Sequence, residues 1–376
     1  MSHINFLEKL MDGCTVKWLE LEQVAKIKHG KDWKGLNAGE VPVYGSGGVM
    51  GYVDEYSYDK PTVLIPRKGS ITNIFYVETP FWNVDTIYYT DIDTSKIVPK
   101  YLYYFIKTTN LMALDTGSGR PSLTQAILNQ IQVPIPCPEN PKKSLEIQVE
   151  IVRILDTFTE LTTELTTELN ARKKQYNYYR DKLLSFEEGK VEWKTLGELA
   201  KNLDSKRKPI TSGLRETGDI PYYGASGIVD YVKDYIFDGD FLLVSEDGAN
   251  LLARNTPIAF SISGKTWVNN HAHVLKFETY AERRYVEYYL NSIDLAPYIS
   301  GSAQPKLNKK NLESIIIPNP SPEEKERIVI ILDKFETLTS SINEGLPREI
   351  ELRQKQYEYY RDLLLGLPKP DSEVAA

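Results

Sequence analysis

The sequence predicts an α+β protein with two tandem globular domains, each followed by a long helix. Three observations support this prediction. The chain of 376 residues is long enough for two domains of ordinary size. Blocks of sequence repeat at a spacing near 180 residues, which is far beyond the period of a solenoid and indicates domain duplication. A long segment without Pro or Gly also carries the spacing of a coiled-coil seam.

The duplication is visible in three pairs of blocks. The first pair shares a Pro, a Tyr-Gly turn and a Tyr-Val dipeptide, the second shares a G-S-x-x-P-x-L loop, and the third agrees at 10 of 15 positions. The pairs are residues 41–56 with 220–235, 117–139 with 301–323, and 172–186 with 353–367. Each copy therefore runs from a turn-rich globular part to the same type of helix end.

Each globular part is expected to mix strands with short helices. Short apolar runs bounded by Gly, Asp and Pro predict strands at residues 62–66 and 241–244. Apolar spacing predicts short helices at residues 100–107 and 284–291.

The first long helix is predicted from a seam of apolar residues. The segment from Glu146 to Phe186 contains no Pro or Gly. Apolar residues recur in it at alternating steps of four and three, as in a coiled coil. They are Ile147, Ile151, Ile154, Phe158, Leu161 and Leu165.

The second long helix repeats this seam after a clear start signal. Ser321 followed by Pro322 is typical of a helix N-terminus. Gly345 and Pro347 interrupt the pattern, because both residues are unfavourable inside a helix. We therefore expect a kink or break near Leu346.

These patterns divide the chain into five parts, and the division also explains its charge. The parts are a first globular domain (1–145), a first long helix (146–189), a second globular domain (190–321), a second long helix (322–367) and a tail (368–376). The net charge is −7, yet both globular parts carry equal numbers of basic and acidic residues. The surplus acid lies in the helical parts and the tail, which should face away from a nucleic acid.

Composition also limits where the protein acts. No run of apolar residues is long enough to cross a membrane, and the first residues lack a signal-peptide pattern. With Cys14 and Cys137 alone, neither a disulfide framework nor a four-cysteine zinc site is supported. We expect a cytoplasmic protein with no membrane partner.

Two similar but non-identical domains, held apart by helices, suit a DNA site with two different halves and an unread gap. The residues leave one alternative open, since a helical hairpin would bury the same seams without any role for DNA.

The sequence resembles the specificity subunits of type I restriction-modification enzymes from Val16 to Leu367. Five motifs carry the resemblance, and each occurs once per repeat. They are W-x-x-L at Trp18 and Trp193, P-x-Y-G at Pro42 and Pro221, G-S-x-x-P-x-L at Gly117 and Gly301, I-L-D-x-F at Ile154 and Ile331, and Q-Y-x-Y-Y-R-D-x-L-L at Gln175 and Gln356.

This resemblance implies two target-recognition domains that each read one half of a bipartite, asymmetric DNA site. The two helices would form an antiparallel coiled-coil spacer between them. In this family two methyltransferase (modification) subunits bind the specificity subunit and methylate adenine from S-adenosylmethionine, and motor-nuclease (restriction) subunits join for cleavage. The present chain would then be a non-catalytic DNA-reading subunit with no cofactor of its own.

No catalytic or metal site is expected in this chain. An adenine methyltransferase should carry a D/N-P-P-Y/F motif and a glycine motif for its cofactor, and the sequence has neither. His271 and His273 form the one close pair among the four histidines, but the sequence supplies no further ligand beside them.

The candidate DNA-binding residues are polar, basic or aromatic residues in the turn-rich parts. Arg and Lys side chains can contact guanine or phosphate, and Gln can contact adenine. An ordinary solvated surface role is the alternative for the basic and polar residues, and packing is the alternative for the tyrosines. The candidates are Tyr44, Arg67, Lys68, Arg120, Lys206, Arg207, Tyr223, Arg254, Gln304 and Lys306.

The candidate partner-binding residues lie in the repeated, Tyr-rich helix ends. Packing between helices within the chain is the alternative. The candidates are Tyr176, Tyr178, Tyr179, Arg180, Asp181, Tyr357, Tyr359, Tyr360, Arg361 and Asp362.

Two other classes of function compete with the DNA-reading subunit. A freestanding DNA-binding regulator with two domains would bind DNA without a methyltransferase, so co-purification would distinguish it. A purely structural scaffold would show no sequence preference in a DNA selection. Within the first reading, the divergence of RKGSITNIF from its counterpart SEDGANLLA predicts that the two halves read different bases.

Overall fold

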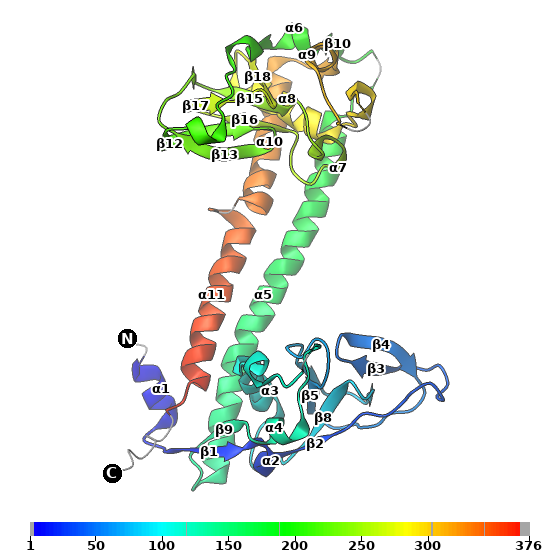
Figure 1. Ribbon diagram of the computed structural model, residues 1–376, viewed down its shortest axis with the longest axis vertical. Helices are drawn as coiled ribbons and strands as arrows, with labels where there is room; N and C mark the ends of the chain where they lie inside the picture. The colour runs from blue at the N-terminus through cyan, green and yellow to red at the C-terminus, as the bar shows by residue number, and fades with distance from the viewer. Residues whose placement is uncertain (1–3, 118, 188, 302–303, 342, 369–376) are drawn as a thin grey trace. The chain divides into compact units, whose positions relative to one another are not determined.

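The computed structural model describes residues 4–117, 119–187, 189–301, 304–341 and 343–368 (Figure 1). Residues 369–376 of the predicted tail lie outside the described residues. The chain divides into two compact units. Unit 1 consists of Met1–Leu165 and Ile350–Ala376, and unit 2 consists of Thr166–Glu349.

Unit 1 contains the first globular part, built on small sheets whose strands are antiparallel except for the parallel pair β3-β7. One sheet has the order β2-β8-β5-β6, another has the order β4-β3-β7, and β1 pairs with β9. The strands are β1 Val16–Glu20, β2 Ala25–Lys28, β3 Val41–Gly45, β4 Gly48–Val53, β5 Thr62–Pro66, β6 Phe75–Val77, β7 Trp82–Asn83, β8 Ile87–Ile92 and β9 Gln132–Pro136.

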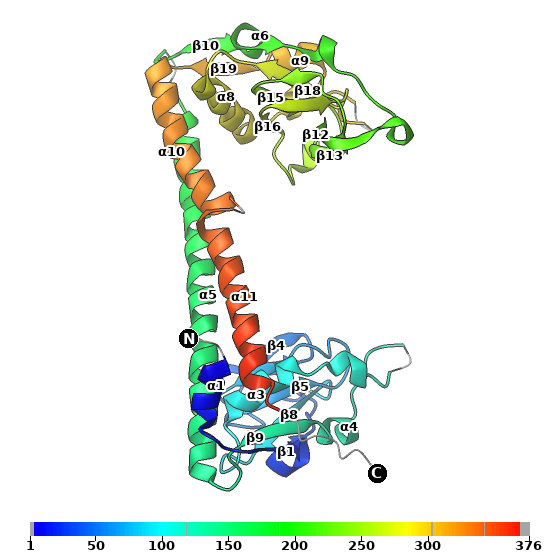
Figure 2. The same cartoon turned by 90° about the vertical axis from the view of Figure 1, so that its left-hand side faces the viewer.

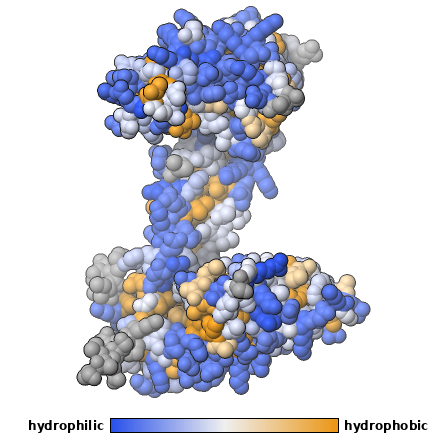
Figure 3. All heavy atoms as spheres, in the orientation of Figure 1, coloured by the Kyte–Doolittle hydropathy of each residue, from blue (hydrophilic) through white to orange (hydrophobic). Residues whose placement is uncertain are grey.

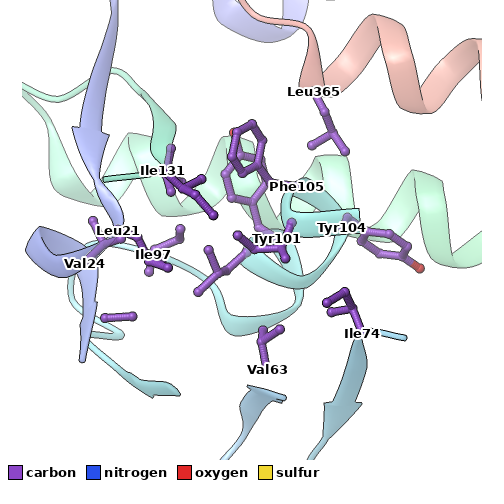
Figure 4. Packing of buried hydrophobic residues seen from close by; sticks show 14 of the residues in the cluster. Leu21, Val24, Val63, Ile74, Ile97, Tyr101, Tyr104, Phe105, Ile131 and Leu365 are labelled. Atoms are coloured by element: carbon purple, nitrogen blue, oxygen red, sulfur yellow. The ribbon is translucent and has the colours of Figure 1, made fainter. Parts of the chain in front are cut away.

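Helices complete the main core of unit 1, which also contains residues of β2, β5, β8 and β9. The helices are α1 Ile4–Met11, α2 Leu21–Val24, α3 Pro99–Thr108, the 3-10 turn Leu111–Leu114, α4 Gln125–Asn129, the first part of α5 Pro141–Leu184 and the last part of α11 Gly345–Leu365. Tyr101 of α3 is fully buried, and its hydroxyl donates to the carbonyl oxygen of Pro134 at 2.9 Å. Leu365, from the far end of the chain, packs into the same cluster (Figure 4).

Unit 2 repeats this architecture with the sheet orders β11-β18-β15-β16 and β13-β12-β17-β14 and the pair β10-β19. Its strands are β10 Glu192–Thr195, β11 Lys201–Asn202, β12 Thr217–Gly224, β13 Gly227–Val232, β14 Phe237–Asp238, β15 Phe241–Ser245, β16 Ala259–Ile262, β17 Lys265–Val268, β18 Ala272–Lys276 and β19 Ile316–Asn319. Its helices are α6 Leu196–Leu199, α7 Asn250–Ala253, α8 Tyr280–Ser292, α9 Lys309–Glu313 and α10 Pro322–Ser340, with 3-10 turns at Asp204–Lys206, Ser212–Leu214 and Ala296–Tyr298.

The duplication therefore extends to three-dimensional structure. The first P-x-Y-G segment forms β3, which pairs in parallel with β7, and the second forms β12, which pairs in parallel with β17. The predicted strands at 62–66 and 241–244 and the predicted helices at 100–107 and 284–291 are confirmed as β5, β15, α3 and α8. The α+β class with two tandem domains and long helices is confirmed as well.

The aspartate of each I-L-D-x-F motif ties the long helix to the globular part. In unit 1 the Asp156 carboxylate accepts from the Tyr104 hydroxyl at 2.5 Å and from the Lys100 ammonium at 2.8 Å. In unit 2 Asp333 accepts from the Tyr288 hydroxyl at 2.6 Å and from the guanidinium of Arg284 at 2.9 Å. A carboxylate at this position accepts charge-assisted hydrogen bonds in both repeats, which explains why the motif recurs.

The phenylalanine of each motif stacks on a tyrosine that comes from the other repeat. In unit 1 the ring of Phe158 stacks on Tyr360 of α11, with centroids 5.2 Å apart. In unit 2 Phe335 stacks on Tyr179 of α5 at 5.7 Å. The last part of α11 lies beside the first part of α5 in both views of unit 1 (Figures 1 and 2). Each unit therefore takes one helix segment from each repeat.

The second long helix is interrupted, as the sequence predicts, but before Leu346. Helix α10 ends at Ser340 and α11 begins at Gly345, where φ is +77°. A Cβ atom at Gly345 would lie 2.3 Å from the carbonyl oxygen of Thr337, so only glycine fits this close turn. Pro347 falls in the first turn of α11, where its missing N–H costs no helical hydrogen bond.

The coiled-coil spacer along the full length of both helices and the domain boundaries stay predictions. The predicted start of α10 is confirmed, since the Ser321 hydroxyl accepts from the backbone N–H of Glu324 at 3.3 Å. Across the part of the chain that the structure describes, every helix is too short or too polar to span a membrane.

We expect Leu364→Ala to destabilise unit 1 by about 2–5 kcal/mol, because it removes a fully buried side chain of α11 from a core built mostly by the first repeat. Hydrogen exchange in β5 and α3 would report the change. Leu352→Ala is the matched control, since this side chain of the same helix is 39% exposed. Equal protection in both variants would contradict the role of α11 in unit 1.

Candidate nucleic-acid interface

In both units the G-S-x-x-P loop is bonded to the end of a central strand. In unit 1 Lys68, after β5, forms a β-bridge with Ser122, and the Leu123 N–H donates to the carbonyl oxygen of Arg67 at 2.8 Å. In unit 2 Asp247, after β15, forms the matching bridge with Lys306. The fold thus brings together two loops that are far apart in sequence.

Unit 1 gathers three predicted DNA-binding residues at this edge. Arg67 is partly exposed, and Lys68 and Arg120 are exposed. The Gly69 N–H donates to the carbonyl oxygen of Pro121 at 3.0 Å, which holds the neighbour of Arg120 against the turn that follows Lys68. Three cationic side chains on one edge form a surface that can contact phosphates or guanine.

Unit 2 places a network of buried charges at the equivalent edge. Glu246 accepts from the Arg207 guanidinium at 2.5 Å and pairs with the Lys306 ammonium at 3.0 Å. Arg207 also lies 3.3 Å from the Asp204 carboxylate, and its side chain is 13% exposed. The prediction that Arg207 contacts DNA stays untested, but its guanidinium is largely used within unit 2. Lys306 is half-exposed and shares its charge with Glu246.

His273 completes this network from β18. Its ring is fully buried, with Nδ1 2.6 Å from a carboxylate oxygen of Asp204 and Nε2 2.7 Å from the carbonyl oxygen of Leu307. A carbonyl oxygen can only accept, so Nε2 carries the proton and fixes the start of α9 to the sheet. In unit 1 Tyr88 occupies the equivalent place, and its hydroxyl donates to the carbonyl oxygen of Leu123 at 3.4 Å.

The sequence shows no ligand beside His273, yet the fold brings two carboxylates to it. The ligand atoms of Asp204, Glu246 and His273 lie within 4.8 Å of one another. The Arg207 guanidinium pairs with both carboxylates, so the protein itself supplies the positive charge that a metal ion would bring. This arrangement favours an internal ion network over a metal centre. The signal that could have revealed it is an acidic residue at the end of β15, where unit 1 has Arg67.

The other predicted DNA-binding residues have different environments. Lys206 and Gln304 are exposed. Arg254 has a left-handed backbone (φ +53°), donates to the carbonyl oxygen of Ile293, and has its pKa lowered by burial. Tyr44 and Tyr223 are half-buried, and burial raises the pKa of both hydroxyls.

Tyr44 and Tyr223 both pack against phenylalanine. The ring of Tyr44 lies 5.8 Å from that of Phe75, and the ring of Tyr223 lies 6.1 Å from that of Phe260. These contacts anchor the P-x-Y-G turns in both units, whether or not the hydroxyls also contact DNA.

The predicted partner-binding residues separate into packed and exposed sets. Tyr176, Tyr179, Tyr357 and Tyr360 pack against the cores or long helices of their units. Tyr178 and Tyr359 are 60% and 49% exposed. Arg180 pairs with Asp181, and Arg361 pairs with Asp362, both at 2.7 Å. The exposed tyrosines are therefore the members of this set with most surface to offer a partner.

Most of the surface of unit 2 in Figure 3 is hydrophilic, with hydrophobic atoms in small patches. Such a surface suits a polar ligand better than a large apolar partner.

The sequence pattern of the type I restriction modification DNA specificity domain matches residues 15–174 and 188–352. The type I restriction enzyme EcoR124I/EcoR124II specificity subunit of Escherichia coli is 39% identical over 408 residues, covering 99% of each chain. A putative type I restriction enzyme specificity subunit of Haemophilus influenzae is 35% identical, covering 96% of this chain and 98% of that protein.

Solved structures show the same fold. The crystal structure of a type I restriction-modification S subunit from M. genitalium has a TM-score of 0.64 and 17% identity, covering 96% of this chain and 98% of that one. At this level of identity the match shows a shared architecture of the chain.

Acid is expected to weaken unit 2 through Asp204 and Glu246. Burial raises the pKa of both carboxyls, but His273 beside Asp204 and Arg207 beside Glu246 outweigh it, so both pKa values lie below their usual 3.8 and 4.5. The unfolded state then binds more protons in this range, and the stability present near neutral pH is lost as the pH falls below about 4.5.

Glu246→Gln should destabilise unit 2 at pH 7 by about 1–3 kcal/mol, because it removes a charged acceptor from a buried network. The difference from the unmodified chain should shrink as the pH falls toward 3.5. Urea unfolding followed by hydrogen exchange in β15 measures both effects, and Glu278→Gln, at an exposed position, is the control. A difference that is independent of pH would contradict the assignment.

Proposed function

Because the chain belongs to the family of type I restriction-modification DNA specificity subunits, we propose that it reads a bipartite, asymmetric DNA site for a multi-subunit enzyme. Its partners are double-stranded DNA, two methyltransferase subunits and motor-nuclease subunits. Adenine methylation and DNA cleavage take place on those partner subunits, with S-adenosylmethionine bound by the methyltransferase. This chain contributes DNA sequence recognition.

The main support for this proposal is the contact between the end of a central strand and the G-S-x-x-P loop, which occurs once in each unit. The same backbone bridge links the strand end to the G-S-x-x-P loop in both, while the side chains on it differ in charge. Unit 1 has Arg67 and Lys68 where unit 2 has the buried Glu246 and the partly exposed Asp247. A repeated scaffold with different polar groups at the same edge is suited to reading two different short sequences.

The lack of net charge on both globular parts supports the proposal that partner subunits strengthen DNA binding. Both globular parts have no net charge, so sequence-independent attraction to phosphates is weak for this chain alone. Partner subunits that contact the DNA backbone would raise its affinity. Recognition and catalysis are in this way divided between subunits.

The proposal predicts the methylation pattern of a host cell that expresses this chain with its cognate methyltransferase subunit. Single-molecule sequencing should show methylated adenines in a gapped, asymmetric motif, and the motif should vanish when this chain is deleted. Methylation that is absent or unchanged by the deletion would overturn the proposal and favour a freestanding DNA-binding regulator.

Tyr178 and Tyr359 are predicted to contact the methyltransferase subunits, because exposed tyrosines are frequent anchors at protein interfaces. Changing each to Ala should weaken association by about tenfold or more, corresponding to about 1.4 kcal/mol or more. Co-purification and titration with the methyltransferase subunit measure this. Tyr56→Ala, at a residue that is 55% exposed in the first globular part, is the control and should bind normally. Normal binding by the double variant would remove these residues from the interface.

A further inference from the structure

One pair of equivalent residues has opposite charge in the two units. Lys68 and Asp247 each follow the central strand of their sheet, each bridges to the G-S-x-x-P loop, and each precedes a glycine with positive φ. These glycines, Gly69 and Gly248, have φ values of +83° and +102°. The backbone thus presents both side chains from the same place in the fold.

We propose that Asp247 and Lys68 are specificity-determining residues with opposite hydrogen-bonding preferences. Asp247 accepts a hydrogen bond from the exocyclic amine of a cytosine or adenine in one half-site. Lys68 donates to the major-groove acceptors of a guanine in the other half-site. This inference rests on the proposed function and assigns a chemical target to each half of the site.

Asp247 lies at a cleft in unit 2 that is large enough to admit part of a base. The cleft has a volume of about 870 Å³ and lies between the turn after β15 and the G-S-x-x-P loop. Its polar lining includes Asp247, His271, Gln304 and Lys306, and Leu252 with two alanines gives it an apolar wall. Helix α7 and the turn before β18, which carries His271, also line it, and all of these segments belong to unit 2.

The partners of Asp247 hold its carboxylate as an acceptor. Both of its oxygens lie 2.9–3.0 Å from Nδ1 of His271, which must donate because a carboxylate has no proton to give. The side chain is 32% exposed, so lone pairs remain accessible from the cleft. His271 therefore orients the carboxylate without occupying all of its acceptor capacity.

The nearest cation at the cleft is already engaged. The Lys306 ammonium lies 3.0 Å from Glu246, whose carboxylate also accepts from Arg207. Lys306 thus balances the Glu246 charge and leaves the charge of Asp247 to act on a ligand. A carboxylate repels phosphates and base acceptors, so its favourable partners in the major groove are the N4 amine of cytosine and the N6 amine of adenine.

Unit 1 offers the opposite chemistry at the same place. Lys68, Arg67 and Arg120 carry hydrogen-bond donors and no acceptor at their charged ends. Guanine presents two acceptors, O6 and N7, in the major groove, and contact with Lys or Arg is its most common recognition. The edge of unit 1 is therefore suited to guanine, and the edge of unit 2 is suited to an amine.

The test uses the complete complex with its methyltransferase subunit and duplexes that contain the motif mapped above. Each cytosine of the motif is replaced in turn by 2-pyrimidinone, and each adenine other than the one that is methylated is replaced by purine, which removes only the exocyclic amine. Each guanine is replaced by 7-deazaguanine, which removes the N7 acceptor. Adenine methylation rates on each duplex are compared for the unmodified chain, Asp247→Asn and Lys68→Ala.

Removal of one amine should slow the unmodified complex by about tenfold or more, and should have much less effect on Asp247→Asn. Removal of N7 at one guanine in the other half-site should likewise slow the unmodified complex, and it should have much less effect on Lys68→Ala. Asp238→Asn, an exposed position on β14, is the matched control and should keep the responses of the unmodified chain.

The possible outcomes separate the two proposals. One outcome is that the unmodified complex methylates a gapped motif while every amine removal slows Asp247→Asn as much as it slows the unmodified chain. In that case the role of Asp247 is wrong and the proposed function stands. If both variants respond at the same half-site, the assignment of one residue to each half is wrong. If the complex produces no motif that depends on this chain, the proposed function itself fails. Thermal unfolding of each variant verifies that it folds.

Discussion

The fold depends on the contact between each I-L-D-x-F motif and a helix end from the other repeat. Phe158 stacks on Tyr360 in unit 1, and Phe335 stacks on Tyr179 in unit 2. Leu364 and Leu365 extend the first of these contacts into the core, and Leu184 does so in unit 2. Because these side chains come from the end of the other repeat, neither repeat contains all of its own core. Each unit therefore buries side chains from both repeats.

The scaffold keeps its geometry while its supporting chemistry changes. In unit 1 the G-S-x-x-P loop is bonded to the neutral hydroxyl of Tyr88, whereas in unit 2 it is bonded to His273, which belongs to a network of buried charges. The backbone bonds from Leu123 and Leu307 to the strand ends are the same in both. Because backbone hydrogen bonds hold the loop, side chains at the edge can differ. A loop that is held by its backbone and can carry different side chains suits a protein whose two halves read different sequences.

The candidate site was predictable in part. The repeat alignment identified both loops, and the fold brings Arg67, Lys68 and Arg120 to one edge as exposed cations. In the sequence Arg207 looks like an exposed basic residue, but its guanidinium forms ion pairs with Glu246 and Asp204. Asp204 is only three residues from Arg207, but Glu246 reaches it from a distant strand end, so the local sequence shows only part of the network. Asp247 is not among the residues predicted from the sequence to bind DNA, because acidic side chains contact DNA less often than basic ones.

The sequence by itself determined the duplication, one central strand, one short helix and the long helix of each copy, the break before α11 and the family. These properties follow from local patterns, such as apolar spacing, Gly and Pro positions and repeated motifs, that need no knowledge of distant contacts. The tertiary structure decided which repeat supplies each helix end and which charged residues are free to meet a ligand. Both depend on residues that approach each other from far apart in the chain, where burial and competing partners set the role of each side chain.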